Sequence, residues 1–158
     1  MFFLKKAYCR VFQIGFRAVL PVLPYREPEI IRSCADLSPV LEKEHARTVL
    51  VVTDRGIVEN GLTAPLEEAL RDARVNYAVY DKTQPNPTVD QVEEALELYY
   101  QRQCTAIIAI GGGSSMDCAK AVGARVAYPH KALSRMKGVL RVLKATPPII
   151  AIPTTEGT

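Results

Sequence analysis

The sequence predicts an α/β fold, in which a Rossmann-like parallel sheet carries helices on both faces. Short apolar, β-branched segments recur along the chain, segments with helical periodicity separate them, and three glycines directly follow one apolar segment. Parallel neighbours need a crossover long enough to be helical, so this alternation favours a parallel sheet. With 158 residues, 48% of them hydrophobic, the chain can bury the core of one domain.

Residues 1–20 are expected to form an amphipathic helix, because apolar residues recur at the helical period and basic residues occupy the opposite stripe. Prolines then end it, so residues 1–24 form a helix and connector ahead of a dinucleotide-binding domain over 25–158. Two roles stay open: packing on the protein or a partner, or targeting to a membrane or organelle. Basic residues interrupt every apolar run, which makes a membrane the less favoured partner.

The first elements of the domain are a helix over 30–44 and a strand over 47–53, whose continuous β-branched run is typical of a strand covered on both faces. After a turn at 54–56, a helix is expected over 62–73. The chain then returns as a strand over 76–80.

Thr88 is expected to cap a helix over 89–102, whose inner stripe is apolar. The next strand, 105–110, runs straight into the three glycines, and a helix over 115–127 follows them. After a basic loop, residues 148–152 form the last predicted strand.

Composition excludes several other functions. The balance of 20 Lys and Arg against 17 Asp and Glu is small and dispersed, so we expect no nucleic-acid partner. Neither His45 nor His130 has a partner at metal-ligand spacing, so no metal site is predicted. The cysteines lack CxxC spacing, and Cys104 and Cys118 fall on predicted core elements, which favours a reducing, cytoplasmic compartment.

The strongest functional signal is the turn Gly111-Gly112-Gly113 between a buried strand and a helix. Glycine lets the backbone approach a ligand closely, and the free amides at a helix N-terminus favour an anion. The turn therefore predicts a phosphate-binding site. Its spacing fits neither GxGxxG nor a P-loop. Alternatively, Ser114 and Asp117 form a capping box and the glycines only make a tight turn.

Two more strand ends carry polar residues. Asp54 follows the first strand and could accept hydrogen bonds from ribose hydroxyls, although Asp is also common in turns. Thr154 and Thr155 follow the last strand and would place hydroxyl and amide donors beside the same crevice, or form a turn. Together the three strand ends predict a ligand site at one edge of the sheet.

Four segments in this order carry a family resemblance: VVTD at 51–54, QPNPT at 84–88, IAIGGGSSMDCAK at 108–120 and AIPTT at 151–155. They resemble the amino-terminal nucleotide-binding domain of the iron-containing (group III) alcohol dehydrogenases, over roughly 30–158. The resemblance implies an NAD(P)-dependent oxidoreductase that interconverts a small alcohol and an aldehyde or ketone by hydride transfer.

By the same resemblance, the glycines and Ser114 would hold the pyrophosphate, with Asp54 facing the adenosine ribose. A carboxylate there would repel a 2′-phosphate and favour NAD over NADP, although Arg55 could reverse the preference. The threonines would contact phosphate and the nicotinamide ribose, and Asn86 would lie near the adenine. The implied cofactor-binding residues are Asp54, Asn86, Gly111, Gly112, Gly113, Ser114, Asp117, Thr154 and Thr155.

Two departures from the family pattern limit the expected activity. Glu156 stands where the family has a small residue, and its charge would weaken phosphate binding unless it points away or pairs with a base such as Lys137. The helical domain that carries the Asp and three His ligands of the catalytic metal, normally iron, is absent from this chain. We therefore expect no catalytic residue, no metal ligand and no turnover from this chain alone, and iron only in an intact enzyme.

Alternatives to this cofactor-binding half stay open. One is a stand-alone nucleotide-binding or regulatory module that pairs with a relative or with its own copies as a homo-oligomer. Another is the equivalent half of a glycerol dehydrogenase-like or dehydroquinate synthase-like enzyme, although Ser114 and the Pro-Thr-Thr turn favour the alcohol dehydrogenases. The last is a domain that binds nothing.

Overall fold

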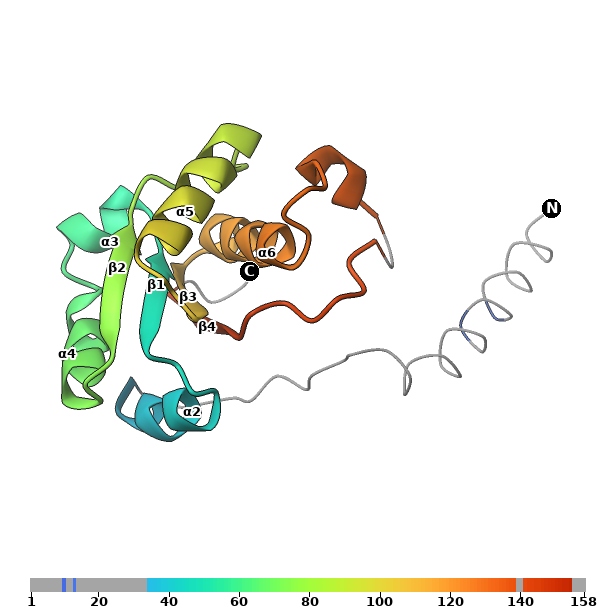
Figure 1. Ribbon diagram of the computed structural model, residues 1–158. Helices are drawn as coiled ribbons and strands as arrows, with labels where there is room; N and C mark the ends of the chain where they lie inside the picture. The colour runs from blue at the N-terminus through green and yellow to red at the C-terminus, as the bar shows by residue number, and fades with distance from the viewer. Residues whose placement is uncertain (1–9, 11–12, 14–33, 139–140, 155–158) are drawn as a thin grey trace.

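In the computed structural model the described residues form one sheet of four strands that are parallel, as predicted, and lie in the order β2-β1-β3-β4 (Figure 1). The structure describes residues 34–138 and 141–154, besides Arg10 and Gln13, so the helix predicted over 1–20 lies outside this description. The strands are β1 (Thr48–Val52), β2 (Asn76–Tyr80), β3 (Ala106–Gly111) and β4 (Ile149–Pro153).

Helices cover both faces of the sheet, which confirms the predicted fold class (Figure 1). One layer holds α2 (Leu37–Lys43) and α4 (Ala64–Asp72), and the other holds α5 (Val89–Gln101) and α6 (Gly113–Ala127). Side chains of β1 alternate between the two cores: Val49 and Val51 pack with α2 and α4, whereas Leu50 and Val52 pack with α5 and α6.

Most element boundaries agree with the predictions to within two residues, and two differences concern short helices. Where a turn is predicted at 54–56, the chain forms α3 (Arg55–Glu59). Where a longer helix is predicted over 30–44, the described part begins with the 3-10 helix η2 (Cys34–Asp36) and continues as α2. A second 3-10 helix, η3 (Leu133–Met136), lies in the predicted basic loop. Helices of three to seven residues are too short to show a hydrophobic period.

The N-terminus of α5 confirms its predicted cap. The Thr88 hydroxyl oxygen accepts a hydrogen bond from the Gln91 amide at 3.3 Å, and the Gln91 side-chain oxygen accepts one from the Thr88 amide at 3.2 Å. This capping box satisfies two amides that would otherwise lack partners at the helix start.

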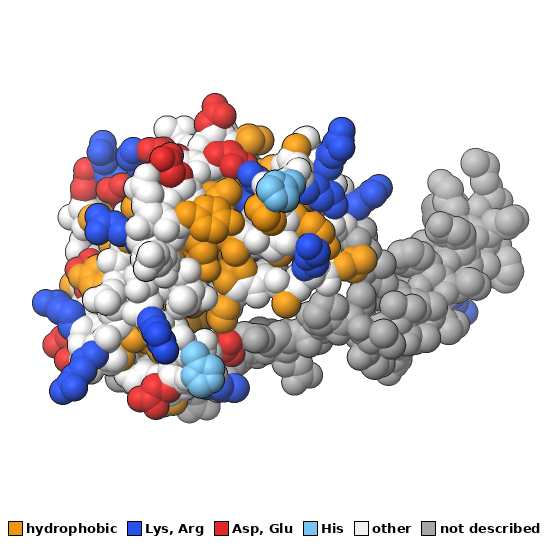
Figure 2. Space-filling view, viewed as in Figure 1, with side chains coloured by type: hydrophobic (Ala, Val, Ile, Leu, Met, Phe, Trp, Pro, Cys, Tyr) orange, Lys and Arg blue, Asp and Glu red, His pale blue; other side chains and the backbone are white. Residues whose placement is uncertain are grey.

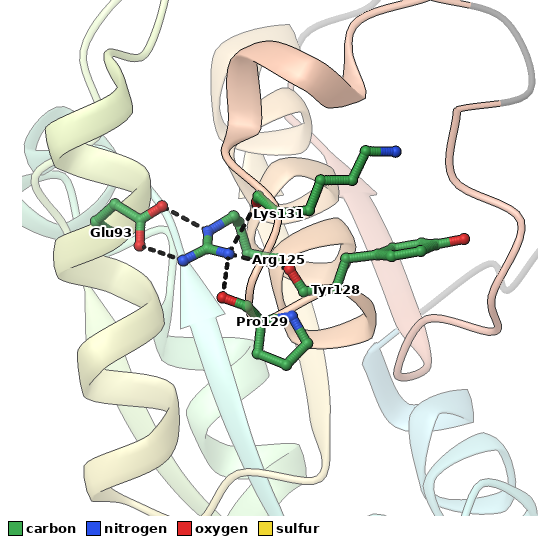
Figure 3. A network of polar contacts seen from close by, with 5 residues as sticks. All are labelled: Glu93, Arg125, Tyr128, Pro129 and Lys131. Atoms are coloured by element: carbon green, nitrogen blue, oxygen red, sulfur yellow. Dashed lines mark hydrogen bonds and ion pairs between the residues drawn. The ribbon is translucent and has the colours of Figure 1, made fainter.

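An arginine on α6 ties the two helices of this layer together (Figure 3). Arg125 holds both carboxylate oxygens of Glu93 on α5, at 2.6 and 3.0 Å. Its remaining nitrogen donates to the main-chain oxygens of Tyr128, Pro129 and Lys131, at 2.7 to 3.0 Å.

The predicted burial of two cysteines is confirmed, since Cys104 and Cys118 are buried and free. Burial raises the pKa of the Cys104 thiol to about 11 and also raises that of Cys118. Among the described residues, no helix combines the length and the apolar character needed to cross a bilayer.

Candidate functional site at the glycine turn

The carboxyl ends of three neighbouring strands meet at one edge of the sheet. β3 lies between β1 and β4, and all three run in the same direction. Asp54 therefore follows β1, the glycine turn follows β3, and Thr154 follows β4 at the same edge. The Thr154 amide donates a hydrogen bond to the Gly111 carbonyl at 3.1 Å. The structure thus brings together the three predicted strand ends, where open α/β sheets bind ligands.

Only glycine fits at the first position of the turn. Gly111 has φ +135, which L side chains rarely adopt, and a Cβ added to it would lie 2.8 Å from Ser115 Oγ. The same Cβ would lie 3.3 Å from Asp54 Oδ2, so the carboxylate is next to the turn. The other oxygen, Oδ1, accepts a hydrogen bond from the Ile57 amide at 3.1 Å and caps α3. Asp54 is therefore a cap whose second oxygen faces the glycine turn.

The alternative interpretation, in which Ser114 and Asp117 form a capping box, is wrong. Helix α6 begins at Gly113, with Gly112 as an extended N-cap residue, and no side chain caps it. Ser114 is therefore already inside the first turn, whereas a capping box needs the serine at the N-cap itself. Asp117 instead lies 3.4 Å from Lys120 Nζ, and its side chain is 70% exposed.

The absence of a cap leaves the start of α6 open to a ligand. Within the described residues, the amides of Gly113, Ser114 and Ser115 donate no hydrogen bond to the protein. A Cβ on Gly113 would meet nothing within 4 Å, so a ligand can approach the backbone here. Free amides and the positive end of the helix dipole attract an anion, with phosphate as the common case.

Two features of the site go beyond the sequence predictions. Ser115 is buried, and its hydroxyl has no hydrogen-bond partner among the described residues. In the sequence, only the position of Ser115 on the inner stripe of a helix indicates that this residue is buried. Lys82 pairs through its backbone with Asp54, which brings the loop after β2 to the same edge. That pairing joins distant segments, and no local pattern indicates it.

The structure does not place three of the predicted site residues at the turn. Two of them lie apart from it, and the third is outside the described residues. Asn86 is exposed, has φ +57, and lies in the loop before α5, where its side chain makes no hydrogen bond within the described residues. Asp117 faces solvent on α6. Thr155 and the neighbouring Glu156 lie outside the described residues.

The described residues do not provide a metal site. They contain no group of three or more His, Cys, Asp or Glu side chains that could hold an ion. The two histidine side chains lie well apart on the face shown in Figure 2.

Comparison with known proteins connects this geometry to a family. The model of the iron-containing alcohol dehydrogenase family matches residues 31–158. Choline dehydrogenase from Bacillus subtilis is 40% identical over 111 residues, which cover 69% of this chain and 28% of that protein. NAD-dependent methanol dehydrogenase from Bacillus methanolicus is 38% identical over 118 residues, covering 75% of this chain and 31% of the relative. The chain thus spans less than a third of the length of these relatives.

Solved structures show the same architecture. A 1,3-propanediol oxidoreductase aligns with a TM-score of 0.77 and 27% identity, covering 86% of this chain and 36% of that one. Sulfoacetaldehyde reductase from Bifidobacterium kashiwanohense, solved in complex with NAD+, aligns with a TM-score of 0.67 and 30% identity, covering 86% of this chain and 37% of that one. Taken with the family match, these alignments show that the chain belongs to the iron-containing alcohol dehydrogenase family.

Proposed function

We propose that this chain binds NAD(P) at the glycine turn and serves as the cofactor-binding part of an alcohol dehydrogenase. The observation that carries the proposal is the uncapped start of α6, where three consecutive amides donate no hydrogen bond within the described residues and a Cβ on Gly113 would meet nothing within 4 Å. A dinucleotide has a pyrophosphate that such amides bind. When bound, the nicotinamide would exchange a hydride with an alcohol or carbonyl substrate.

The residues around the turn fit the other parts of a dinucleotide. Gly112, Gly113 and Ser114 would hold the pyrophosphate through their backbone, and Thr154 would add a hydroxyl beside Gly111. Asp54 would accept hydrogen bonds from the adenosine ribose through Oδ2. Asn86, Asp117 and Thr155 remain proposed contacts that rest on the family pattern.

Asp54 also supports a preference for NAD over NADP, since its charge would repel a 2′-phosphate. The guanidinium of the adjacent Arg55 lies 3.9 Å from Glu59 rather than on Asp54, which supports a preference set by Asp54. The Asp54→Asn variant isolates the charge, since asparagine keeps a side-chain oxygen that can cap α3.

Calorimetric titration with NAD+ and NADP+ tests this assignment. We expect the unmodified chain to bind NAD+ more tightly, and the Asp54→Asn variant to lose at least about fivefold of that preference. Equal binding of the two cofactors by the unmodified chain, or an unchanged ratio in the variant, would rule out this role for Asp54. Failure of both cofactors to bind would remove the proposed function itself.

The described residues do not fit a catalytic iron centre, because they offer no cluster of metal-ligating side chains. We therefore assign them no catalytic residue. We also propose that this chain alone, supplied with NAD+, Fe2+ and a short alcohol, binds the cofactor without forming NADH.

A further inference from the structure

A second cleft lies at the opposite edge of the sheet, where β1 and β2 begin. Its volume is about 600 Å³. Three arginines dominate its polar lining, together with Thr48 and Asn76 from the first positions of the two strands. The glycine turn lies at the carboxyl edge, so the proposed cofactor site does not account for this cleft. The cleft is lined by Thr48, Arg71, Arg74, Val75, Asn76, Tyr77 and Arg102.

The three arginines come from both helix layers. Arg71 lies in the last turn of α4, and Arg74 follows that helix with a left-handed φ of +56. Arg102 is the C-cap residue of α5, which packs on the other face of the sheet. Along the lower edge of the molecule in Figure 2, below β1 and β2 of Figure 1, Lys and Arg side chains alternate with Asp and Glu side chains.

The three guanidinium groups of this cleft belong to exposed arginines, and the nearest carboxylate contact in the lining is that of Glu67 with the Tyr77 hydroxyl. No Asp or Glu lines the cleft, and none of the three arginines forms an ion pair within the described residues. Arg71 Nε donates only to the main-chain oxygen of Glu67, at 3.2 Å. The Glu67 carboxylate accepts hydrogen bonds from the Thr63 and Tyr77 hydroxyls, at 2.8 and 3.0 Å.

Helix dipoles explain part of this charge but not all of it. Cations near helix C-termini are favourable, and each C-terminus carries roughly −0.5 charge, so α4 and α5 together supply about −1. Three guanidinium groups supply three positive charges, so a positive excess of about one remains when the Glu67 carboxylate bonded to Tyr77 is counted as well. A role in stabilising the helix ends would not need that excess.

We propose that this cleft binds a phosphate dianion, either free phosphate or the phosphate of a small phosphomonoester. The positive excess favours an anion, and guanidinium groups bind phosphate oxygens through two parallel hydrogen bonds. Asn76 and Thr48 add neutral polar side chains to the lining of the cleft. Its volume also accommodates a small organic molecule attached to the phosphate.

Amide NMR spectra of the isotope-labelled chain test the proposal during titration with inorganic phosphate or glycerol phosphate, at constant ionic strength set with chloride. We expect saturable shifts at Arg74, Asn76 and Arg102. Phosphate at the glycine turn would shift Gly113 and Ser115 instead, so the two sites report separately. A tighter response to glycerol phosphate assigns the site to an ester, and an equal response assigns it to free phosphate.

The double variant Arg74→Gln, Arg102→Gln removes two of the three charges. We expect it to weaken phosphate binding at the cleft by at least tenfold, with any response at Gly113 unchanged. The control is Arg55→Gln, which removes an exposed arginine outside the cleft and should change nothing. A response that does not saturate, that chloride reproduces, or that survives in the double variant would overturn the proposal.

Discussion

Gly111 and Gly113 lie two residues apart, yet a methyl group meets different surroundings at each. At Gly111 it would require φ +135 and would contact Ser115 and Asp54, whereas at Gly113 it would enter open space. We expect Gly111→Ala to lower the free energy of unfolding by about 1 to 3 kcal/mol. Gly113→Ala should leave it unchanged or raise it by roughly 0.5 kcal/mol. Urea unfolding measures both, and similar losses in the two variants would contradict the turn geometry.

Residue motifs were predictable only where local geometry decides them. Thr88 caps α5 as expected, and Gln91 completes a capping box because both residues lie within one helical turn. The same spacing at Ser114 and Asp117 does not produce a box. There β3 ends at Gly111 and Gly112 becomes the N-cap residue, so α6 begins at Gly113, ahead of Ser114. Spacing alone does not show which residue becomes the N-cap.

Buried ionisable groups predict a loss of stability at alkaline pH. Burial raises the pKa of Cys104 to about 11 and that of Tyr99 to about 12. In the unfolded chain a thiol ionises near pH 8.5 and a phenol near pH 10. Unfolding therefore releases protons above about pH 8.5. The stabilisation is complete below that pH and is lost as the pH rises toward the folded pKa values.

Urea midpoints between about pH 7.5 and pH 10.5 measure this effect, and we expect them to fall steadily above about pH 8.5. Cys104→Ala is the matched variant, since it removes one of the groups and should make the decline shallower. A midpoint that stays constant or rises over this range would contradict the burial of these side chains.

Arg125 holds α6 in position through its main-chain contacts as well as through its ion pair with Glu93. Arg125 is 14% exposed and donates to three main-chain oxygens besides holding Glu93 (Figure 3). Arg125→Met removes the donor to the Pro129 and Lys131 carbonyls, whereas the Tyr128 carbonyl keeps the Lys131 amide at 3.1 Å, and we expect a loss of about 2 to 4 kcal/mol. Glu93→Gln removes only the charge of a side chain that is 40% exposed, so about 1 kcal/mol is expected. Equal losses in thermal or urea unfolding would contradict the role of the three carbonyl contacts.

At the scale of elements, strands were more predictable than short helices. Each strand is a β-branched or apolar run whose observed ends lie within one residue of the prediction. Helix α3 is only five residues long and depends on the Asp54 cap, so it has no periodic pattern to detect.

At the scale of the whole molecule, helix ends of opposite partial charge lie at the two edges of the parallel sheet. The carboxyl edge receives the N-terminus of α6, while the amino edge receives the C-termini of α4 and α5. An anion at the first edge can be held by backbone amides alone, whereas one at the second needs arginines to outweigh the helix ends. The proposed cofactor site and the proposed phosphate site therefore use different chemistry.

The two sites also differ in how far the sequence predicts them. The glycine turn is contiguous, so its composition reveals an anion cradle. Arg71, Arg74 and Arg102 are brought together across the sheet edge by the β-α crossovers, and this pairing of distant segments has no local signature. Sequence patterns find the first kind of site and miss the second.

Fluorescence titration of the 158-residue chain with NADH tests the central claim most directly, with Gly113→Val as the comparison. The added side chain would fill the open space in front of the α6 amides, so we expect saturable binding by the unmodified chain and at least about a tenfold loss in the variant. Unfolding curves of the two proteins should agree to within about 1 kcal/mol. No binding by the unmodified chain, or undiminished binding by a folded variant, would contradict the assignment of the glycine turn as the cofactor site.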